Sequence, residues 1–496
     1  MNNEISNAQL QLKLARNQGD IDKMSEIYGQ LADLYHQIGQ TKTALGICQI
    51  NIEMLEKYND KQKLGYAYLK MARIFGEGSY YCALPYLANA LDIFTQIGDE
   101  EGIATINYWL GKFTPDNESA IKYFETGAEL FDKLRHGGGL VLCLTLQGAH
   151  LTNLGKYTEA EAVLEKAVYV ARQINDPELL DDALYHLAKT YNYDEKHFKG
   201  QKLIEEAIDI NRKTEDYYDL AYMLFTYGQI LMALEKYDEA IAAFKESENI
   251  NRVAGDLEPV PEILCKLGRT YFYKGDNLTA LQYFTQELTM RSDYDDSKAT
   301  TLSNLAYVCM QLGYTQEAVK YGIMRLNQLE HKIKIGIDKS EKAEALFDLA
   351  QAYEANLEYP KAEHACIESI KIYQEIAAQH PDFDSTPIEN AKTLLDKIEK
   401  NIPQEHGAIP TMDVPDVYTP EFIYSVIVPL IADKLGVDPS EITPEVHFTN
   451  DLGGDALDEI ETVMTIEKEF NISIPDNEAE NVGTIGHLVE IVGKYL

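Results

Sequence analysis

One small residue recurs along most of this chain at intervals close to forty residues, and this repeat limits the fold more than any other feature. In most copies it follows a short polar turn and precedes a bulky residue four places further on. The nine positions, called marker residues below, are Ala44, Ala83, Ala120, Ala160, Gly200, Ala240, Ala280, Ala318 and Ala362. Subtracting successive numbers gives spacings of 39, 37, 40, 40, 40, 40, 38 and 44 residues. This period predicts stacked structural repeats, each of which packs against its neighbours.

Each copy predicts two antiparallel helices that cross at small residues. In three copies a glycine stands twelve places before the marker residue, at Gly148, Gly228 and Gly268. Two helices can approach closely only where their crossing point lacks bulky side chains, so Gly and Ala are expected there. Alternation of Val, Ile and Thr is scarce, which argues against strands. The sequence therefore predicts an all-α solenoid.

The residues around each turn add a family resemblance. The fourth copy carries, in order, Gly148, Leu151, Gly155, Tyr157, Ala160, Leu164 and Ala167. This arrangement resembles the tetratricopeptide repeat (TPR), although that repeat is usually about 34 residues long and the extra residues here fall after the second helix. The resemblance implies a superhelix whose concave face, lined by the first helices, binds a protein or a peptide. Asn107, Asn153 and Asn304 could hold a peptide backbone there, the alternative being that they are simply solvated.

The charge of the chain limits the kind of partner. With 44 Lys and Arg against 81 Asp and Glu, the formal net charge is −37. Phosphate backbones and anionic lipid surfaces require a field of the opposite sign, so neither nucleic acid nor membrane is expected as a partner. The start of the sequence shows no basic segment followed by an apolar run, and no stretch of eighteen apolar residues occurs. These features predict a cytoplasmic protein.

Candidate chemical groups in the array are weak. The six cysteines lie far apart without a paired motif, which favours buried free thiols over metal ligands or disulfides. The run from His136 to Gly139 lacks the Lys-Ser or Lys-Thr of a phosphate loop and is expected to be a flexible connection between repeats. Neither a metal-ligand pattern nor a nucleophile motif is visible, so the sequence predicts no catalytic residues, no metal site and no enzyme.

The pattern of the array stops near residue 401. Four prolines between 403 and 420 predict a semi-extended linker over 402–419. Helix-like patterning then resumes and continues through residues 420–496. We therefore expect three parts, namely a TPR array over 1–401 with about nine repeats plus capping helices, the linker, and a small four-helix module.

The last segment resembles acyl carrier proteins. The residues that carry the resemblance are Leu435-Gly436-Val437-Asp438, Phe448-Thr449-Asn450-Asp451-Leu452-Gly453-Gly454-Asp455-Ala456-Leu457-Asp458 and Ile474-Pro475-Asp476. In that family a serine between Asp and Leu bears 4′-phosphopantetheine at the start of a helix, where free N–H groups favour a phosphate. Here Ala456 occupies that position and has no attachment oxygen. The resemblance thus implies no cofactor as the sequence stands, and 4′-phosphopantetheine only if residue 456 is naturally serine.

The resemblance also implies a docking surface on the helix that begins near Asp455. In the family, acids on this helix are recognised by basic patches of partner proteins. The matching positions here are Asp455, Leu457, Asp458, Glu461, Val463, Met464 and Glu467. Thr462 and Lys468 depart from the family, since an aliphatic residue and an acid are usual there. An ordinary solvated face is the alternative explanation for the acids.

Two functions remain open from the sequence. In the first, the chain is a non-catalytic scaffold whose array binds one partner and whose module, without an attachment oxygen, docks a second. In the second, the natural chain is a phosphopantetheine-dependent acyl carrier fused to TPRs, and Ala456 is an engineered replacement of serine. Both explain one lost oxygen in an otherwise intact motif, and a single sequence does not separate them.

Overall fold

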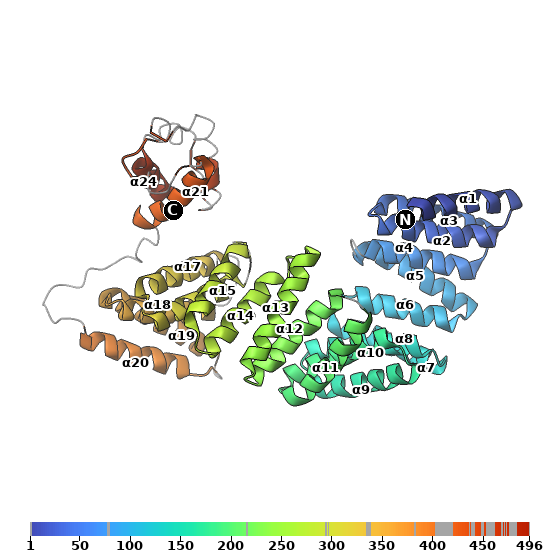
Figure 1. Cartoon of the computed structure of the whole chain (residues 1–496), viewed down its shortest axis with the longest axis horizontal. Helices are drawn as coiled ribbons and strands as arrows, with labels where there is room; N and C mark the ends of the chain where they lie inside the picture. Colours follow the sequence, from blue (N-terminus) through green and yellow to red (C-terminus); the bar gives the residue numbers. More distant parts are fainter. Residues whose placement is uncertain are drawn as a thin grey trace. The chain divides into compact units, whose positions relative to one another are not determined.

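The computed structural model describes residues 2–76, 80–214, 217–292, 295, 297–333, 339–380 and 383–401, and, discontinuously, parts of 420–495. These residues form two compact units, Met1–Leu312 and Gly313–Leu496. The predicted linker over 402–419 lies outside the described residues. Within the described parts, helices are the only regular elements, which confirms the all-α expectation (Figure 1).

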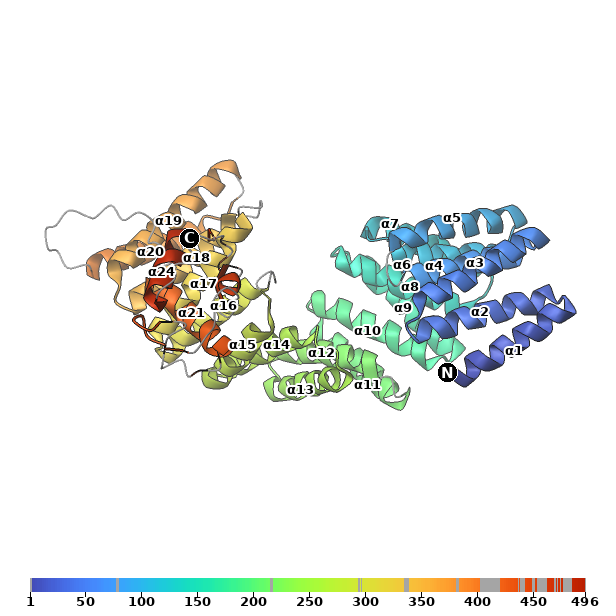
Figure 2. The same ribbon diagram turned by 90° about the horizontal axis from the view of Figure 1, so that it is seen from above.

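The first unit is a succession of helices joined by short turns. The helices are α1 (Asn2–Gln18), α2 (Ile21–Gln37), α3 (Thr41–Tyr58), α4 (Lys61–Gly76), α5 (Tyr80–Ile97), α6 (Glu100–Phe113), α7 (Asn117–Lys133), α8 (Gly137–Asn153), α9 (Tyr157–Ile174), α10 (Pro177–Tyr193), α11 (His197–Thr214), α12 (Tyr217–Ala233), α13 (Tyr237–Ala254), α14 (Val260–Tyr273), α15 (Asn277–Met290) and α16 (Lys298–Leu312). Each even-numbered helix from α2 to α14 packs against the helix that follows it, and consecutive even-numbered helices also contact one another (Figure 2). The even-numbered helices are therefore the first helices of the repeats.

The second unit holds the remaining array helices and the C-terminal module. Its helices are α17 (Thr315–Ile333), α18 (Lys339–Ala355), α19 (Tyr359–Gln379), α20 (Thr386–Asn401), α21 (Pro420–Leu435) and α24 (Ile485–Tyr495). The unit boundary at residue 312 falls inside the repeated pattern, so it differs from the domain boundary expected at 401. The domain boundaries read from the sequence remain a prediction.

The marker residues occupy the same place in all nine second helices. Each is the fourth residue of its helix, as in α9, which starts at Tyr157 and carries Ala160. The eight alanines are completely buried, and Gly200 is buried too. A side chain longer than a methyl group does not fit where two helices cross this closely. The repeat read from the sequence is therefore a real structural period.

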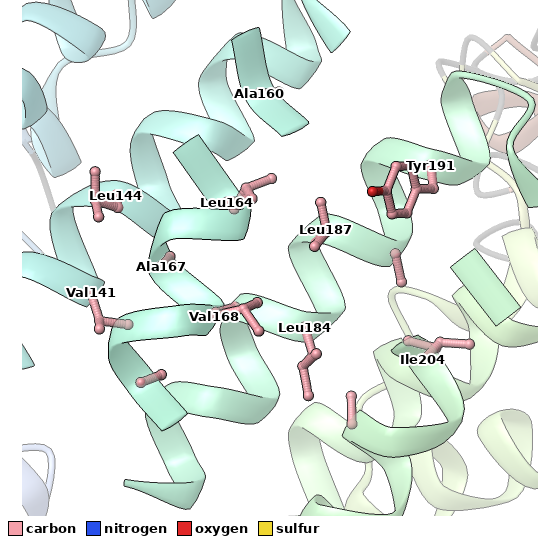
Figure 3. Packing of buried hydrophobic residues seen from close by; sticks show 14 of the residues in the cluster. Val141, Leu144, Ala160, Leu164, Ala167, Val168, Leu184, Leu187, Tyr191 and Ile204 are labelled. Carbon is pink, nitrogen blue, oxygen red and sulfur yellow. The ribbon is translucent and has the colours of Figure 1, made fainter. Parts of the chain in front are cut away.

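The crossing glycines explain why the pairs pack so tightly. A Cβ added at Gly148 would stand 2.3 Å from Cγ of Leu164, and one added at Gly228 would stand 2.6 Å from the ring of Phe244. In these copies the bulky residue of the second helix thus fills the space left by glycine on its partner. Figure 3 shows the continuation of this packing, where side chains of α8, α9, α10 and α11 interdigitate in one core. Burial of each such side chain contributes roughly 1.5–3 kcal/mol.

The glycine run after His136 is not the flexible connection that the sequence suggested. Residues 137–139 form the first turn of α8, and the N–H of Gly139 donates to Nδ1 of His136 at 2.9 Å, which caps the helix. A Cβ at Gly139 would lie 2.6 Å from the ring of Phe131, and one at Gly137 would lie 2.6 Å from Ile174. The glycines are small for close packing, so the expectation of a flexible loop was wrong.

The C-terminal module has a hydrophobic core of its own. Its core combines Ile423, Ile427 and Ile431 of α21 with Val463 and Ile466 of the helical residues 462–467 and with Ile485, Leu488 and Val492 of α24. His447 and Thr484 form an isolated antiparallel bridge. The rest of the four-helix arrangement lies outside the described residues.

Candidate functional site

The first helices of unit 1 form a continuous face that carries polar and aromatic side chains. Consecutive first helices α2, α4, α6, α8 and α10 contact one another, so their outward side chains adjoin. On α10 one stripe at helical spacing remains partly exposed and comprises Asp182, Tyr185, His186 and Lys189. The neighbouring stripe on α6 includes Tyr108, Trp109 and Lys112. These are the side chains that a ligand on this face would meet.

Trp109, the single tryptophan of the chain, lies between two cations. The guanidinium carbon of Arg73 on α4 is 5.0 Å from its ring centroid, and Nζ of Lys112 is 5.1 Å from it. Both distances are in the range of cation–π attraction. Tyr108 packs edge-on against Trp109 with ring centroids 5.3 Å apart. Two successive first helices thus present positive charge around an aromatic platform.

Two titratable groups of α10 adjoin each other on this face. The side chain of Asp182 is 45% exposed, burial raises its pKa to about 6, and the nearby charge of Lys112 offsets only part of that effect. Burial also lowers the pKa of His186 to about 4. His186 Nε2 lies 3.5 Å from Asp182, so at neutral pH this contact is not an ion pair.

A cavity of about 690 Å³ lies at the other end of this face, among α2, α3 and α4. Of its three lysines, Lys63 pairs with Asp22 and Lys70 pairs with Asp33 at 2.5 Å, while Lys23 makes no ion pair with the described residues. Asn51 on its wall is 6% exposed, and its Oδ1 accepts no hydrogen bond from the described residues. The cavity therefore offers one acceptor and one cation to a ligand.

The three asparagines expected on the face have different roles. Asn107 is 7% exposed and its side-chain amide donates to the carbonyl of Ile103 at 2.8 Å, so its amide is engaged within its own helix. Asn153 is exposed at the last residue of α8. Asn304 is partly buried and lies 3.9 Å from Sγ of Cys265. The sequence missed the Trp109 cluster, although the single tryptophan on a first helix was a usable signal.

The expected attachment position of the C-terminal module is Ala456. Asp455, Ala456, Leu457, Asp458 and Glu461 lie outside the described residues. The residues present do not fit 4′-phosphopantetheine, because Ala456 offers a methyl group where a hydroxyl oxygen would have to form the phosphodiester.

In the described part of the expected docking helix, residues 462–467, some side chains are exposed and others are buried. Met464 is 61% exposed, as a contact residue would be. Val463 is 5% exposed and packs in the module's core, so the expectation that it contacts a partner is corrected. Glu467 is half-buried and its carboxylate accepts the N–H of Ile474 at 2.7 Å. Thr462 is 2% exposed, and its hydroxyl has no hydrogen-bond partner among the described residues.

The described residues offer few other groups suited to catalysis or to metal binding. All six cysteines are free, and five of them are buried, while Cys82 on α5 is exposed. Burial raises the pKa of the Cys48, Cys143 and Cys265 thiols to about 12. No cluster of three His, Cys, Asp or Glu suited to a metal ion occurs among these residues. None of the described helices is both long and apolar enough to cross a membrane.

Comparisons with known proteins agree with this division of the chain. The fold and the site define a helical-repeat protein that ends in a small carrier-like module. Tetratricopeptide-repeat family models match residues 147–174 and 179–252, and a model described as a phosphopantetheine attachment site matches residues 425–492. Acyl carrier proteins from two strains of Porphyromonas gingivalis are 47% identical over 70 residues, which are 14% of this chain and 90% of those proteins. Through its C-terminal module the chain belongs to the acyl carrier protein family, and its array consists of tetratricopeptide repeats.

Two solved structures show some similarity at low sequence identity. A signal transduction ATPase with a tetratricopeptide repeat sensor from Pyrococcus horikoshii is 17% identical, with 68% of this chain and 52% of that chain covered at a TM-score of 0.49. Aspartyl phosphate phosphatase F from Bacillus subtilis is 13% identical, with coverage of 65% and 93% and a TM-score of 0.42. Neither similarity carries a functional argument.

Proposed function

We propose that the chain is a non-catalytic scaffold whose array binds a protein or peptide on its first-helix face and whose C-terminal module docks a second protein. The observation that carries the proposal is the continuous face of first helices, on which charged and aromatic side chains stay accessible instead of closing a core. We propose the domain boundaries read from the sequence as those of the two binding parts. Partners, in this proposal, are proteins and not nucleic acids or membranes.

The proposed role of the C-terminal module depends on the residue at position 456. Ala456 has no oxygen for pantetheine attachment, so binding by the module requires only its surface. Asp455, Leu457, Asp458, Glu461, Met464 and Glu467 are the proposed contacts for a basic patch of the second partner. The exposed side chain of Met464 supports this proposal. We place the protein in the cytoplasm as part of the same proposal.

Photo-crosslinking tests the role of the array. Tyrosines exposed on first helices, Tyr66, Tyr193 and Tyr307, would each be replaced by a photoreactive phenylalanine analogue in the full chain. Tyr58 and Tyr169 on second helices are exposed to a similar extent and serve as matched controls. Cross-links to one partner from the first-helix positions alone would support the proposal. Cross-links to that partner only from the second helices would contradict it.

A second candidate function is the phosphopantetheine-dependent carrier, which the 47% identity to acyl carrier proteins favours. Mass spectrometry of the protein from its native source separates the two candidates. An added phosphopantetheine mass would show serine at 456 in nature and would exclude the unmodified scaffold. An unmodified chain with alanine at this position supports the scaffold, and modification of the Ala456→Ser variant by a pantetheinyl transferase would then show that only the oxygen is missing.

A further inference from the structure

The cavity among α2, α3 and α4 is lined by one stripe of residues from each of its two first helices. Within each helix most lining residues recur at i, i+3, i+4 and i+7, and they are Asp22, Ser25, Glu26 and Gly29 on α2, and Lys63, Tyr66, Ala67 and Lys70 on α4. Residues at this spacing share one face of a helix. Cys48 and Asn51 of α3 line the same cavity. Its volume of about 690 Å³ is in the usual range of small-molecule sites.

Gly29 leaves space in this cavity that close packing does not require. A Cβ added at Gly29 would meet no atom within 4 Å, whereas one added at the crossing residue Gly148 or Gly228 would clash with a side chain. Gly29 lies in the middle of α2, where glycine is less favourable than alanine because it loses more conformational freedom on folding. The missing side chain therefore weakens the helix and keeps the cavity open.

Asn51 is a buried polar residue whose carbonyl oxygen lacks a partner. It lies seven residues after the marker Ala44, and the equivalent residues of three other repeats are Ala90, Ala167 and Ala207. Oδ1 of Asn51 accepts no hydrogen bond from any described residue, although the residue is only 6% exposed. The terminal torsion of asparagine is soft, so Oδ1 can turn toward the cavity that Asn51 lines. A ligand that donates to Oδ1 would supply the missing hydrogen bond.

Two side chains of opposite charge at the cavity make no ion pair with the residues that the structure describes. They are Lys23 and Glu26, three residues apart on α2, and Glu26 accepts only a weak hydrogen bond from Gln30 at 3.4 Å. The other charged lining groups are engaged, because Lys63 pairs with Asp22, Lys70 pairs with Asp33, and the Asp20 carboxylate accepts the N–H of Lys23. The cavity can therefore take one negative and one positive group.

We propose that this cavity binds a free α-amino acid with a large apolar side chain. The carboxylate of the ligand pairs with Lys23, and its ammonium group pairs with Glu26 and donates to Oδ1 of Asn51. The apolar side chain occupies the space beside Gly29 and packs against Tyr66. This site goes beyond the proposed function, which concerns proteins or peptides on the first-helix face.

The arrangement of charges selects an α-amino acid over simpler ligands. An α-amino acid carries its carboxylate and its ammonium group on one carbon, and Lys23 and Glu26 are neighbours on one helix surface, so both pairs can form together. An alkylamine would leave Lys23 without a partner. A carboxylate without an amine would leave Oδ1 of Asn51 unpaired and would be repelled by Glu26.

Isothermal titration calorimetry of the full chain tests the ligand class. L-Phenylalanine and L-leucine should each give saturable heat for one site. Phenethylamine, which lacks the carboxylate, and 3-phenylpropionate, which lacks the ammonium group, should bind at least about tenfold more weakly than L-phenylalanine. The inference is overturned if neither amino acid binds with a Kd below about 10 mM, or if phenethylamine binds as tightly as L-phenylalanine.

Filling the cavity tests its location without removing a packing contact. Gly29→Leu places a side chain in open space and should weaken L-phenylalanine binding at least about tenfold, while the free energy of unfolding stays equal or rises because leucine favours helix. The matched control is Gly46→Leu, at an exposed position of α3 that also has open space and does not line the cavity. It should bind as the parent chain does. Equal affinities of the two variants would overturn the location.

Two further variants test the polar contacts. Asn51→Ala introduces the residue that three other repeats carry and should weaken L-phenylalanine binding at least about tenfold without lowering the free energy of unfolding. Lys23→Met should weaken the binding of L-phenylalanine and leave that of phenethylamine unchanged. Unchanged affinity of Asn51→Ala for L-phenylalanine would overturn the inference. The photo-crosslinks from Tyr193 and Tyr307 report on the proposed function and do not involve this cavity, so each proposal can fail without the other.

Discussion

The early and the late repeats place different types of side chain at the same junction between helices. The residue seven places after each marker is called the seam residue here. In the early repeats the seam residues are Ala90, Gly127, Ala167 and Ala207, and in the late repeats they are Ser247, Glu287, Arg325 and Ser369. All eight are buried. The first repeat departs from its neighbours with the buried Asn51.

The apolar seams leave no space for a larger residue. A Cβ added at Gly127 would lie 2.9 Å from Sγ of Cys143 on the next first helix and 3.3 Å from the carbonyl oxygen of Ala104 on its own. Both neighbours therefore contact the same small position. These seams are stabilised by close packing alone.

The polar seams use hydrogen bonds and ion pairs instead. The hydroxyls of Ser247 and Ser369 donate to the carbonyls of Ala221 and Ala343, at 2.7 and 2.6 Å, in both cases 26 residues earlier. Arg325 reaches across to Asp348 on the next first helix at 2.5 Å. The comparison teaches that the crossing at the marker sets the repeat geometry, while the seam tolerates any side chain whose polar atoms find partners.

The largest expected effect comes from removing a charge at a polar seam. Glu287 is 1% exposed, pairs with the guanidinium of Arg291 at 2.7 Å and accepts from Thr301 at 2.7 Å. Glu287→Ala leaves a buried arginine with less compensation and should lower the free energy of unfolding by about 2–4 kcal/mol, measured by urea denaturation. Glu248→Ala removes a partly exposed pair of the same i,i+4 type, in which Arg252 is 43% and Glu248 17% exposed, and should cost no more than about 1 kcal/mol. Equal costs would break the distinction between seam and surface.

A smaller effect tests the claim that the crossing is common to both regions. Gly148→Ala in an early repeat and Gly228→Ala in a late one should each cost about 1–2 kcal/mol, because overpacking against Leu164 or Phe244 exceeds the gain in helix propensity. Urea denaturation measures both. Adding Phe244→Leu to Gly228→Ala should recover part of the loss. A cost in only one region would show that the crossing, and not just the seam, differs between them.

Asp181, on α10 in the early region, is a buried acid whose titration gives a second test of buried charge. Burial raises the pKa of Asp181 to about 6, and the amide of Asn211 donates to it at 3.1 Å. A carboxyl that binds its proton more tightly when folded destabilises the fold above that pKa, and the penalty vanishes as the pH falls below about 4.

Asp181→Asn should therefore raise the free energy of unfolding by about 1 kcal/mol at pH 7.5, with little effect near pH 4. Denaturation at the two pH values measures this difference. Asp209→Asn on the exposed side of α11 is the control and should be neutral at both. A gain that is independent of pH would show that packing, and not charge, determines the cost of burying Asp181.

The smallest effect concerns the serine seams. Ser247→Ala removes one buried hydrogen bond and makes a late seam resemble the early ones. The carbonyl of Ala221 belongs to a helix, so the variant should lose only about 0.5–1 kcal/mol. Hydrogen exchange of α12 and α13 would report the loss locally. A loss as large as that of Glu287→Ala would mean that polar seams are stabilised by their hydroxyl groups and not by packing.

Local pattern was enough to predict the array. The marker residues of all nine repeats lie at the same helical position because each crossing requires a small residue, whatever the neighbouring repeats contain. The motif around Ala456 likewise established the carrier family, since it is continuous in sequence and matches known acyl carrier proteins. Local pattern failed at the glycines after His136, where it could not tell a flexible loop from a tightly packed helix start.

The sequence by itself determined the period, the helix pairs, the net charge and the absent oxygen at residue 456. Only the tertiary structure brought Arg73, Trp109, Lys112 and Asp182 close together on one face, because these residues belong to three different repeats and lie up to 109 positions apart in the sequence. It also decided that Val463 is buried and that Arg325 has a partner. A repeating pattern fixes which helices are neighbours. The contacts between their side chains depend on packing distances that no single repeat encodes.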